Sequence, residues 1–198
     1  TRKQFSNLVL SVVDGDVYYP KESNKYTVLF KSCNTTWKDN SMNTEGSTLC
    51  NEWNGGSLIT SLSMSLYQYG YKWNNNDITP DILNQFMLSQ NAYGNDNIIN
   101  DPNVLSSISN TISFIGSFNS MNINDLKHYI NEGYVIIAMA KRILTHNAYY
   151  NDISRYINII GYSTTDNDVI IARDALLNQQ RFSFENDISG DYWIWNFA

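Results

Sequence analysis

The spacing of apolar residues predicts one long helix in the first half of the chain. Apolar side chains recur every three or four positions from Ile59 to Tyr69, which places them on a single helical face. A glycine pair precedes Ser57, and Gly70 follows the apolar run, as is typical of a turn and of a helix end. We therefore expect Ser57 to lie on the first turn of a buried helix.

Two shorter helices follow from the same periodicity. The first has Thr79 as its N-cap and Pro80 at its first helical position, and it continues to Met87. The second spans Asn122 to Glu132 and ends at Gly133, where a left-handed cap is expected.

The other apolar runs are rich in β-branched and aromatic residues, which predicts strands. They are residues 8–13, 26–30, 134–140, 156–162, 169–172 and 192–195. In the last run Trp193 and Trp195 alternate with Ile194, so we expect the two indoles on one face of the sheet and Ile194 on the other. Helices followed by antiparallel strands predict an α+β fold.

Length and charge narrow the possible partners. A chain of 198 residues with 42% hydrophobic content can bury one sizeable core, which we assign to residues 26–198, with residues 1–25 as an N-terminal extension or edge strands. The formal net charge is −6, and no cluster of basic residues occurs, so we expect no nucleic-acid partner. No apolar run approaches the roughly 20 residues that cross a bilayer, so we expect no membrane insertion.

The only two cysteines predict a disulfide. Cys33 and Cys50 bracket a turn-rich segment with few residues that could pack, and a bridge across it would contribute about 3 kcal/mol. Two free buried thiols are the alternative. Asn34 begins a sequon for N-glycosylation, Asn-Thr-Thr. Both features favour an extracytoplasmic or secreted location.

The two histidines give little support for a metal site. His128 falls on the polar side of the third predicted helix, where a solvated surface residue is expected. His146 lies in a loop ahead of the strand that begins near Arg155, so its imidazole could fold back toward Ser57. With the cysteines paired, two histidines form no convincing zinc set, and no phosphate-binding or dinucleotide motif occurs, so we expect neither a metal nor a cofactor.

Several motifs, in this order along the chain, resemble the papain-like cysteine peptidases, in particular the bacteriocin leader-processing peptidases and their secreted relatives. The resemblance covers roughly residues 26–184. It is carried by the two cysteines, by the helix with the sequence Gly-Ser-Leu-Ile-Thr-Ser-Leu-Ser-Met that ends in Tyr-Gly, by Ile78-Thr79-Pro80-x-x-Leu83, and by the strand from Tyr156 to Tyr162. It implies a papain-like fold with helices packed on an antiparallel sheet. In that family the helix begins with a catalytic cysteine, and a histidine and an acidic or amide residue follow on later strands.

Two of the three catalytic positions are replaced in this chain. The resemblance places Ser57 at the cysteine position, Arg155 at the histidine position and Asp174 at the acid position. The glutamine that stabilises the oxyanion is missing, and Asn51 and Asn54 are the nearest amides. A guanidinium cannot accept the proton of a serine hydroxyl at physiological pH, so we expect Arg155 and Asp174 to form an ion pair that closes the old site.

Three hypotheses about function follow. The first is a catalytically inactive peptidase-like domain that binds a protein or a peptide. The second is an active hydrolase, a peptidase or amidase, in which Ser57 is the nucleophile and a displaced base such as His146 activates it. The third is a structural subunit of a larger assembly, which the aromatic strand at Trp193 and Trp195 would favour if its indoles were exposed.

Overall fold

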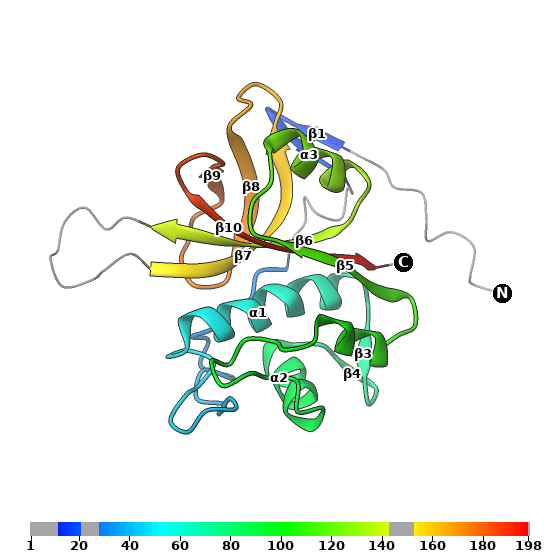
Figure 1. The fold of residues 1–198 in the computed structure, drawn as a ribbon, viewed down its shortest axis with the longest axis vertical. Helices are drawn as coiled ribbons and strands as arrows, with labels where there is room; N and C mark the ends of the chain where they lie inside the picture. Colours follow the sequence, from blue (N-terminus) through cyan, green and yellow to red (C-terminus); the bar gives the residue numbers. More distant parts are fainter. Residues whose placement is uncertain (1–11, 21–27, 143–152, 198) are drawn as a thin grey trace, which may run out of the picture.

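An antiparallel sheet of eight strands forms the centre of the molecule (Figure 1). The computed structural model describes residues 12–20, 28–142 and 153–197. Its elements in chain order are β1 (Val12–Asp14), β2 (Val17–Tyr19), α1 (Trp53–Gln68), β3 (Lys72–Trp73), β4 (Asn76–Asp77), α2 (Pro80–Ser89), the 3₁₀-helix η2 (Pro102–Ser107), β5 (Ile112–Phe118), α3 (Ile123–Asn131), β6 (Val135–Arg142), β7 (Ile153–Ser163), β8 (Val169–Asp174), β9 (Arg181–Ser183) and β10 (Ile188–Phe197).

Strand β7 pairs with three other strands of this sheet, β2, β6 and β8. It pairs with β6 along its first part and with β8, which in turn pairs with β9. On the other side of β6 the sheet continues through β10 to β5. The β1–β2 hairpin joins the last residues of β7, and a side chain at Gly161 would bring its Cβ within 2.3 Å of the Tyr18 carbonyl oxygen. Glycine is therefore needed at the point where β2 pairs with β7. The described part of residues 1–25 forms β1 and β2 and belongs to the main sheet.

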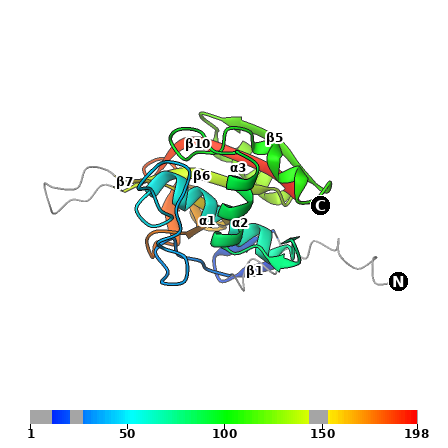
Figure 2. The same ribbon diagram turned by 90° about the horizontal axis from the view of Figure 1, so that it is seen from below.

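Helices cover both faces of the sheet, which confirms the predicted α+β class (Figure 1). Helices α1 and α2 and the small β3–β4 hairpin lie on one face, and α3 lies on the other. Seen from below, α2 lies beside α1 (Figure 2). The sheet is thus a central layer between two apolar clusters.

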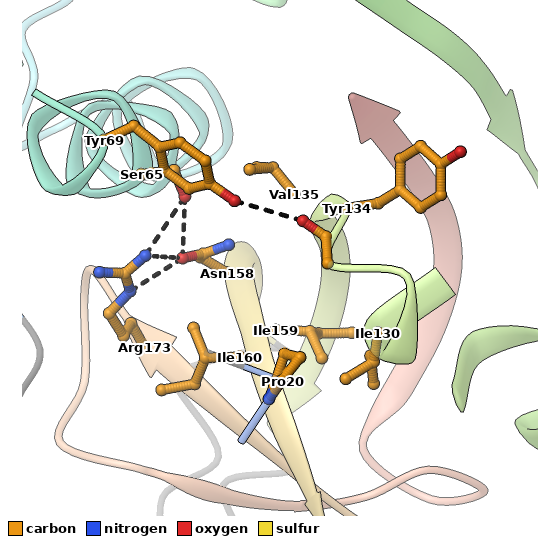
Figure 3. A pocket seen from close by; sticks show the side chains of 11 residues that line it. Pro20, Ser65, Tyr69, Ile130, Tyr134, Val135, Asn158, Ile159, Ile160 and Arg173 are labelled. Atoms are coloured by element: carbon orange, nitrogen blue, oxygen red, sulfur yellow. Dashed lines mark hydrogen bonds between the residues drawn. The ribbon is translucent and has the colours of Figure 1, made fainter. Parts of the chain in front are cut away.

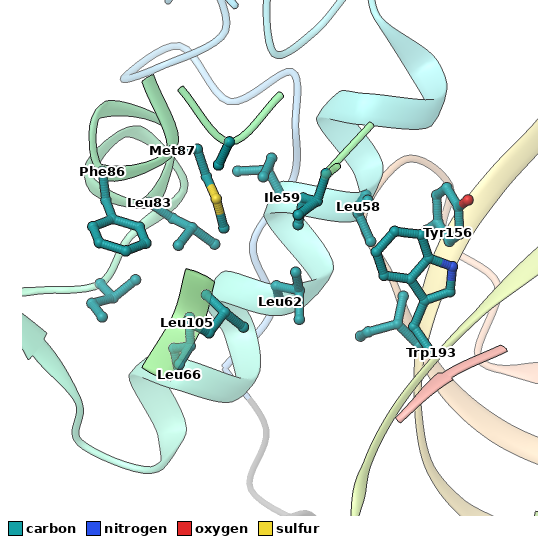
Figure 4. Packing of buried hydrophobic residues seen from close by; sticks show 14 of the residues in the cluster. Leu58, Ile59, Leu62, Leu66, Leu83, Phe86, Met87, Leu105, Tyr156 and Trp193 are labelled. Atoms are coloured by element: carbon teal, nitrogen blue, oxygen red, sulfur yellow. The ribbon is translucent and has the colours of Figure 1, made fainter. Parts of the chain in front are cut away.

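The larger cluster fills the space between α1, α2 and the sheet (Figure 4). Leu58, Ile59, Leu62 and Leu66 of α1 are fully buried in it. The alternation predicted for the last strand is confirmed: Trp193 and Trp195 belong to this cluster, whereas Ile194 packs into the second cluster under α3. Both indoles are buried, so this strand presents no exposed tryptophan.

Helices α2 and α3 match their predictions. Thr79 is the N-cap of α2 with Pro80 at its first position, and Asn122 caps α3 by accepting a hydrogen bond from the Asp125 amide. Gly133 has the expected positive φ of 78° just beyond α3.

Some predicted strand boundaries were wrong. Residues 28–30 are not a strand, and the rest of the runs 8–13 and 26–30 lies outside the described residues, except for Val12 and Val13 in β1. The pattern also missed β5 and β9. β5 contains serine and glycine between its apolar residues, and β9 has only three residues, so neither gives a clear apolar run.

Candidate functional site

Helix α1 begins four residues earlier than predicted. It starts at Trp53, so the glycine pair lies inside the helix and Ser57 is its fifth residue, on the second turn. The amide of Gly56 already donates to the Glu52 carbonyl at 2.7 Å. The unpaired N–H groups of a helix belong to its first residues, and Ser57 is not among these.

Close packing explains why glycines occur within the helix. A Cβ at Gly56 would lie 2.1 Å from the Leu49 carbonyl oxygen, and one at Gly55 would lie 2.5 Å from the Asn97 carbonyl oxygen. Both glycines are buried. They let Leu49, which lies between the two cysteines, and Asn97 pack directly against the helix backbone, and they do not interrupt the helix.

The hydroxyl of Ser57 is enclosed and has hydrogen-bond partners on both sides. It donates to the Asn54 carbonyl at 3.0 Å and accepts the backbone N–H of Tyr156 at 2.8 Å. One turn later, Ser61 donates to the Tyr156 carbonyl at 3.1 Å. Ser57 and Ser61 have no exposed surface. Two serines of α1 therefore bind the backbone of one β7 residue.

This arrangement compensates for the end of a strand. In the register of β7 with β8, Ile157 pairs with Asp174, the last residue of β8. Tyr156 is one step beyond that pair, where β8 no longer supplies partners. Buried backbone groups need hydrogen bonds, and the serine hydroxyls provide them. Ser57 thus has a structural role in the described geometry.

The predicted ion pair between Arg155 and Asp174 is present. Arg155 donates through Nε at 3.0 Å and Nη2 at 2.9 Å to Oδ2 of Asp174, and both side chains are buried. The Arg155 Nη2 also donates to Gln179, and the guanidinium lies over the ring of Phe182. Nη1 has no hydrogen-bond partner. The other oxygen of Asp174 accepts two backbone N–H groups, those of Leu176 and Leu177, so the carboxylate also orders the loop after β8.

The three positions that the resemblance assigns to a catalytic triad do not form one site. Successive residues of a strand point to opposite faces, and Tyr156 packs in the cluster under α1. Arg155 therefore points to the other face, where Phe182 belongs to the α3-side cluster. Asp174 joins Arg155 there, and Ser57 remains on the α1 side. The predicted ion pair therefore forms, but it does not cover Ser57.

The two candidate oxyanion amides differ in their surroundings. The side chain of Asn51 accepts the Thr48 N–H at 2.6 Å and donates to the Gly46 carbonyl at 2.9 Å, so it stabilises its own turn. Asn54 contributes its backbone carbonyl to Ser57. Neither arrangement provides the pair of donors that an oxyanion needs.

A polar contact that the sequence did not reveal involves the side chain of Tyr156, the residue whose backbone binds Ser57. The hydroxyl of Tyr156 and the indole N–H of Trp193 both donate to the carboxylate of Asp191, the latter at 2.9 Å. Asp191 has a positive φ of 51°, directly after Gly190 at 104°. Burial, and then the hydrogen bond to Asp191, raises the pKa of Tyr156 well above its usual value, so this phenol cannot act as a base near neutral pH.

A second polar centre surrounds Arg173, which no motif singled out (Figure 3). Arg173 lies in β8 between Ala172 and Asp174 and is buried. It donates to Asn158 at 2.8 Å, to Ser65 of α1 at 3.2 Å and to Gln68 at 2.5 Å. Desolvation by burial lowers its pKa to about 9, so it remains protonated at neutral pH. The signal in the sequence was an arginine that directly follows the apolar run 169–172.

The cysteines form the predicted disulfide. Cys33 and Cys50 are joined with an S–S distance of 1.98 Å and a Cα–Cα distance of 4.5 Å. The sequon residue Asn34 is exposed, and its side-chain oxygen accepts the Thr36 N–H at 2.9 Å. The disulfide agrees with an oxidising compartment.

Of the two histidines, the structure describes only His128. His128 is exposed on α3, as predicted, and contacts the ring of Tyr129. His146 lies outside the described residues. In the part of the chain that the structure describes, no group of three or more His, Cys, Asp or Glu side chains could hold a metal ion. Among the described residues, no helix is long and apolar enough to cross a membrane.

In comparisons with known proteins, no family model matches this chain, and no curated protein is similar to it.

Proposed function

We propose that this chain is a non-catalytic, papain-like domain that binds a protein or peptide partner outside the cytoplasm. The observation that carries the proposal is the Ser57 hydroxyl, which is inaccessible to solvent and bonded to two backbone groups. A nucleophile must reach its substrate and have a base beside it. Ser57 contacts no base among the described residues, and Arg155 is held in an ion pair on the opposite face of β7.

The active-hydrolase alternative requires a rearrangement. The nucleophile would have to release Asn54 and Tyr156 before His146 or another base could approach it. Treatment of the full chain with a fluorophosphonate tests this. We expect no adduct at Ser57, with Ser57→Ala as the control that assigns any labelled peptide. Labelling of Ser57 that is lost in His146→Ala would establish the hydrolase and overturn the proposal.

The edge strand β5 favours binding as the retained role. It is the outermost strand on its side of the described sheet. Residues 112–118 contain no charged residue and no proline, the usual features that prevent edge pairing, although a register shift occurs opposite Ile194 and Trp195. Ile115 is 43% exposed on it. An extended segment of a partner protein could therefore add to the sheet at this edge.

A charge placed on β5 tests this role. Ile115→Lys should abolish capture of peptides selected from a random display library on the purified protein, because the ammonium opposes docking of an apolar strand. Leu88→Lys is the matched control, since Leu88 is 37% exposed on α2, away from the edge. If selected peptides bind Ile115→Lys as well as wild type, β5 is not the binding edge. A selection that yields no binding peptide would instead favour a structural subunit.

A further inference from the structure

The interior around the end of β8 contains more positive than negative charge. Lys31 and Arg155 lie close to one carboxylate, that of Asp174, and the preceding residue of β8, Arg173, is a further cation. The amino group of Lys31 donates to the Asp174 carbonyl at 2.6 Å and to the Leu177 carbonyl, and Arg155 pairs with the Asp174 side chain. Gln179, which accepts a hydrogen bond from Arg155, donates to a second carboxylate, that of Asp187, at 3.3 Å. This excess of cations occurs in a chain whose net charge is −6.

Arg173 is the most unusual of these cations. Its acceptors are all neutral: the side chains of Asn158, Ser65 and Gln68 and the Val28 carbonyl at 3.5 Å. No described carboxylate forms an ion pair with it. Buried charges in proteins are normally paired, because removing an ion from water costs several kcal/mol. Arg173 therefore has hydrogen bonds without a counter-charge.

A cavity of about 320 Å³ lies beside these charges. We call it the Lys31 cavity. Lys31, Arg173 and Asp174 line it, and its apolar wall includes Leu29, Ile171 and Leu177. The amide residues 178–180 also belong to the lining. Ser57 and Arg155 do not line it. Its size falls within the range of small-ligand sites, and its lining combines an apolar wall with a few polar groups, as such sites do.

Donors remain for a ligand in this cavity. The ammonium of Lys31 has three N–H groups and uses two for backbone carbonyls, so one is left. Gln180 is exposed, and its side chain is in no hydrogen bond of the described chain. Burial is the largest influence on Lys31 and lowers its pKa, the Asp174 carboxylate acts against this and raises it, and repulsion by Arg155 lowers it. An anion in the cavity would relieve both penalties.

We propose that the Lys31 cavity binds a carboxylate that carries an apolar group, with the carboxylate beside Lys31 and Arg173 and the apolar group against Leu29 and Ile171. A free organic acid and the C-terminal residue of a peptide share this chemistry. Inorganic phosphate offers the charge without the apolar part. The site is separate from Ser57 and from the β5 edge, so it does not depend on the function proposed above.

Calorimetric titration of the full chain at low ionic strength tests the site. The probes are octanoate, acetyl-Gly-Gly-Leu with a free carboxylate, the same peptide as its C-terminal amide, and inorganic phosphate. We expect octanoate or the free-carboxylate peptide to bind and the amide not to bind. Tighter binding of octanoate identifies a free acid, and tighter binding of the peptide identifies a chain terminus. Absence of binding by both carboxylates at millimolar concentration, or binding of phosphate alone, overturns the proposal.

Two variants locate the site. Gln180→Glu keeps the shape of an exposed side chain and adds a negative charge at the cavity edge, so we expect at least tenfold weaker binding. Gln85→Glu adds the same charge on the exposed face of α2 and should bind as wild type does. Lys31→Met should also lose binding, with Lys72→Met as its control. If Lys31→Met is unfolded by circular dichroism, Gln180→Glu decides. Equal affinity in wild type and Gln180→Glu would place the ligand elsewhere and contradict the inference.

Discussion

Two adjacent residues of β7 hold the structure together by different means. At Tyr156, on the α1 face, the contacts are neutral: two serine hydroxyls bind the backbone of the strand. At Arg155, on the opposite face, the contact is a buried ion pair with Asp174. The neutral contact leaves no group of Ser57 or Tyr156 unpaired. The ionic contact leaves one nitrogen of Arg155 without a partner.

This difference separates positions that the family resemblance joins in one catalytic site. In the structure, Ser57 and Arg155 serve different packing layers, and each has partners of its own. Neutral hydrogen bonds contribute modestly and depend little on pH, whereas a buried charge is costly as soon as its partner is removed. Variants of the two contacts should therefore differ in the size of their effects.

The largest effect is expected at the ion pair. Asp174→Asn keeps an oxygen for the amides of Leu176 and Leu177 but leaves Arg155 without a counter-charge, and we expect the free energy of unfolding to fall by about 3–5 kcal/mol. The double variant Arg155→Met with Asp174→Asn should recover most of this loss, since it removes the unpaired charge. Urea denaturation followed by tryptophan fluorescence measures both. If the double variant is less stable than Asp174→Asn alone, the pair is not the source of the cost.

The disulfide should have the next largest effect. Cys33 and Cys50 are 17 residues apart, and the segment between them packs through Leu49 against Gly56 of α1. Replacing both cysteines with alanine should cost about 3 kcal/mol, mainly because the unfolded chain gains freedom. Thermal unfolding of the oxidised protein and of the double variant checks this. A reduced wild type should match the variant, and a reduced protein that is as stable as the oxidised one would contradict the prediction.

A smaller effect is expected at Ser57. In Ser57→Ala the buried N–H of Tyr156 loses its acceptor, so we expect a loss of about 1–3 kcal/mol in the free energy of unfolding. Ser63→Ala is the matched control, because Ser63 is equally buried but donates only to the Thr60 carbonyl of its own helix, so its loss should be below about 1 kcal/mol. Equal losses would mean that the contact of Ser57 with β7 adds no more to the free energy of unfolding than a hydrogen bond within the helix.

The sequence predicted those features that depend on local chemistry. Thr79-Pro80 and Asn122 are helix-start signals that act within a few residues, and both mark the observed helix starts, with Asn122 also capping its helix through its side chain. The disulfide followed from there being only two cysteines. The partnership of Arg155 with Asp174 followed from the family resemblance together with the need of a buried charge for a counter-charge.

The features that the sequence concealed depend on packing between distant segments. Gly55 and Gly56 suggested a helix boundary, because glycine permits both a chain break and close approach, and only the position of Leu49 and Asn97 shows which applies. In the same way, Arg173 and Asp191 acquire their roles from neighbours far along the chain. The side of β7 on which Arg155 lies also decides that it cannot meet Ser57, and a resemblance between motifs does not reveal this.

An exposed ion pair sharpens the comparison, because it should behave differently from both contacts on β7. Asp16, in the turn between β1 and β2, accepts hydrogen bonds from Arg181 at 2.5 and 3.2 Å, and the two side chains are 40% and 49% exposed. The Arg181 guanidinium lowers the pKa of Asp16 to about 2, from 3.8. A lowered pKa in the folded state adds stability above the unfolded value, and this contribution is lost as pH falls toward 2.

The stability difference between wild type and Asp16→Asn should therefore be small near pH 6, shrink as pH falls from about 4 toward 2, and decrease in high salt. Urea denaturation at stepped pH values measures it, with Asp81→Asn, a partly exposed carboxylate at the start of α2 that has no arginine partner among the described residues, as the control. A difference that stays constant across this pH range would show that Asp16 stabilises the turn by shape. Its charge would then contribute nothing to stability, in contrast to the charge of the buried pair of Arg155 and Asp174.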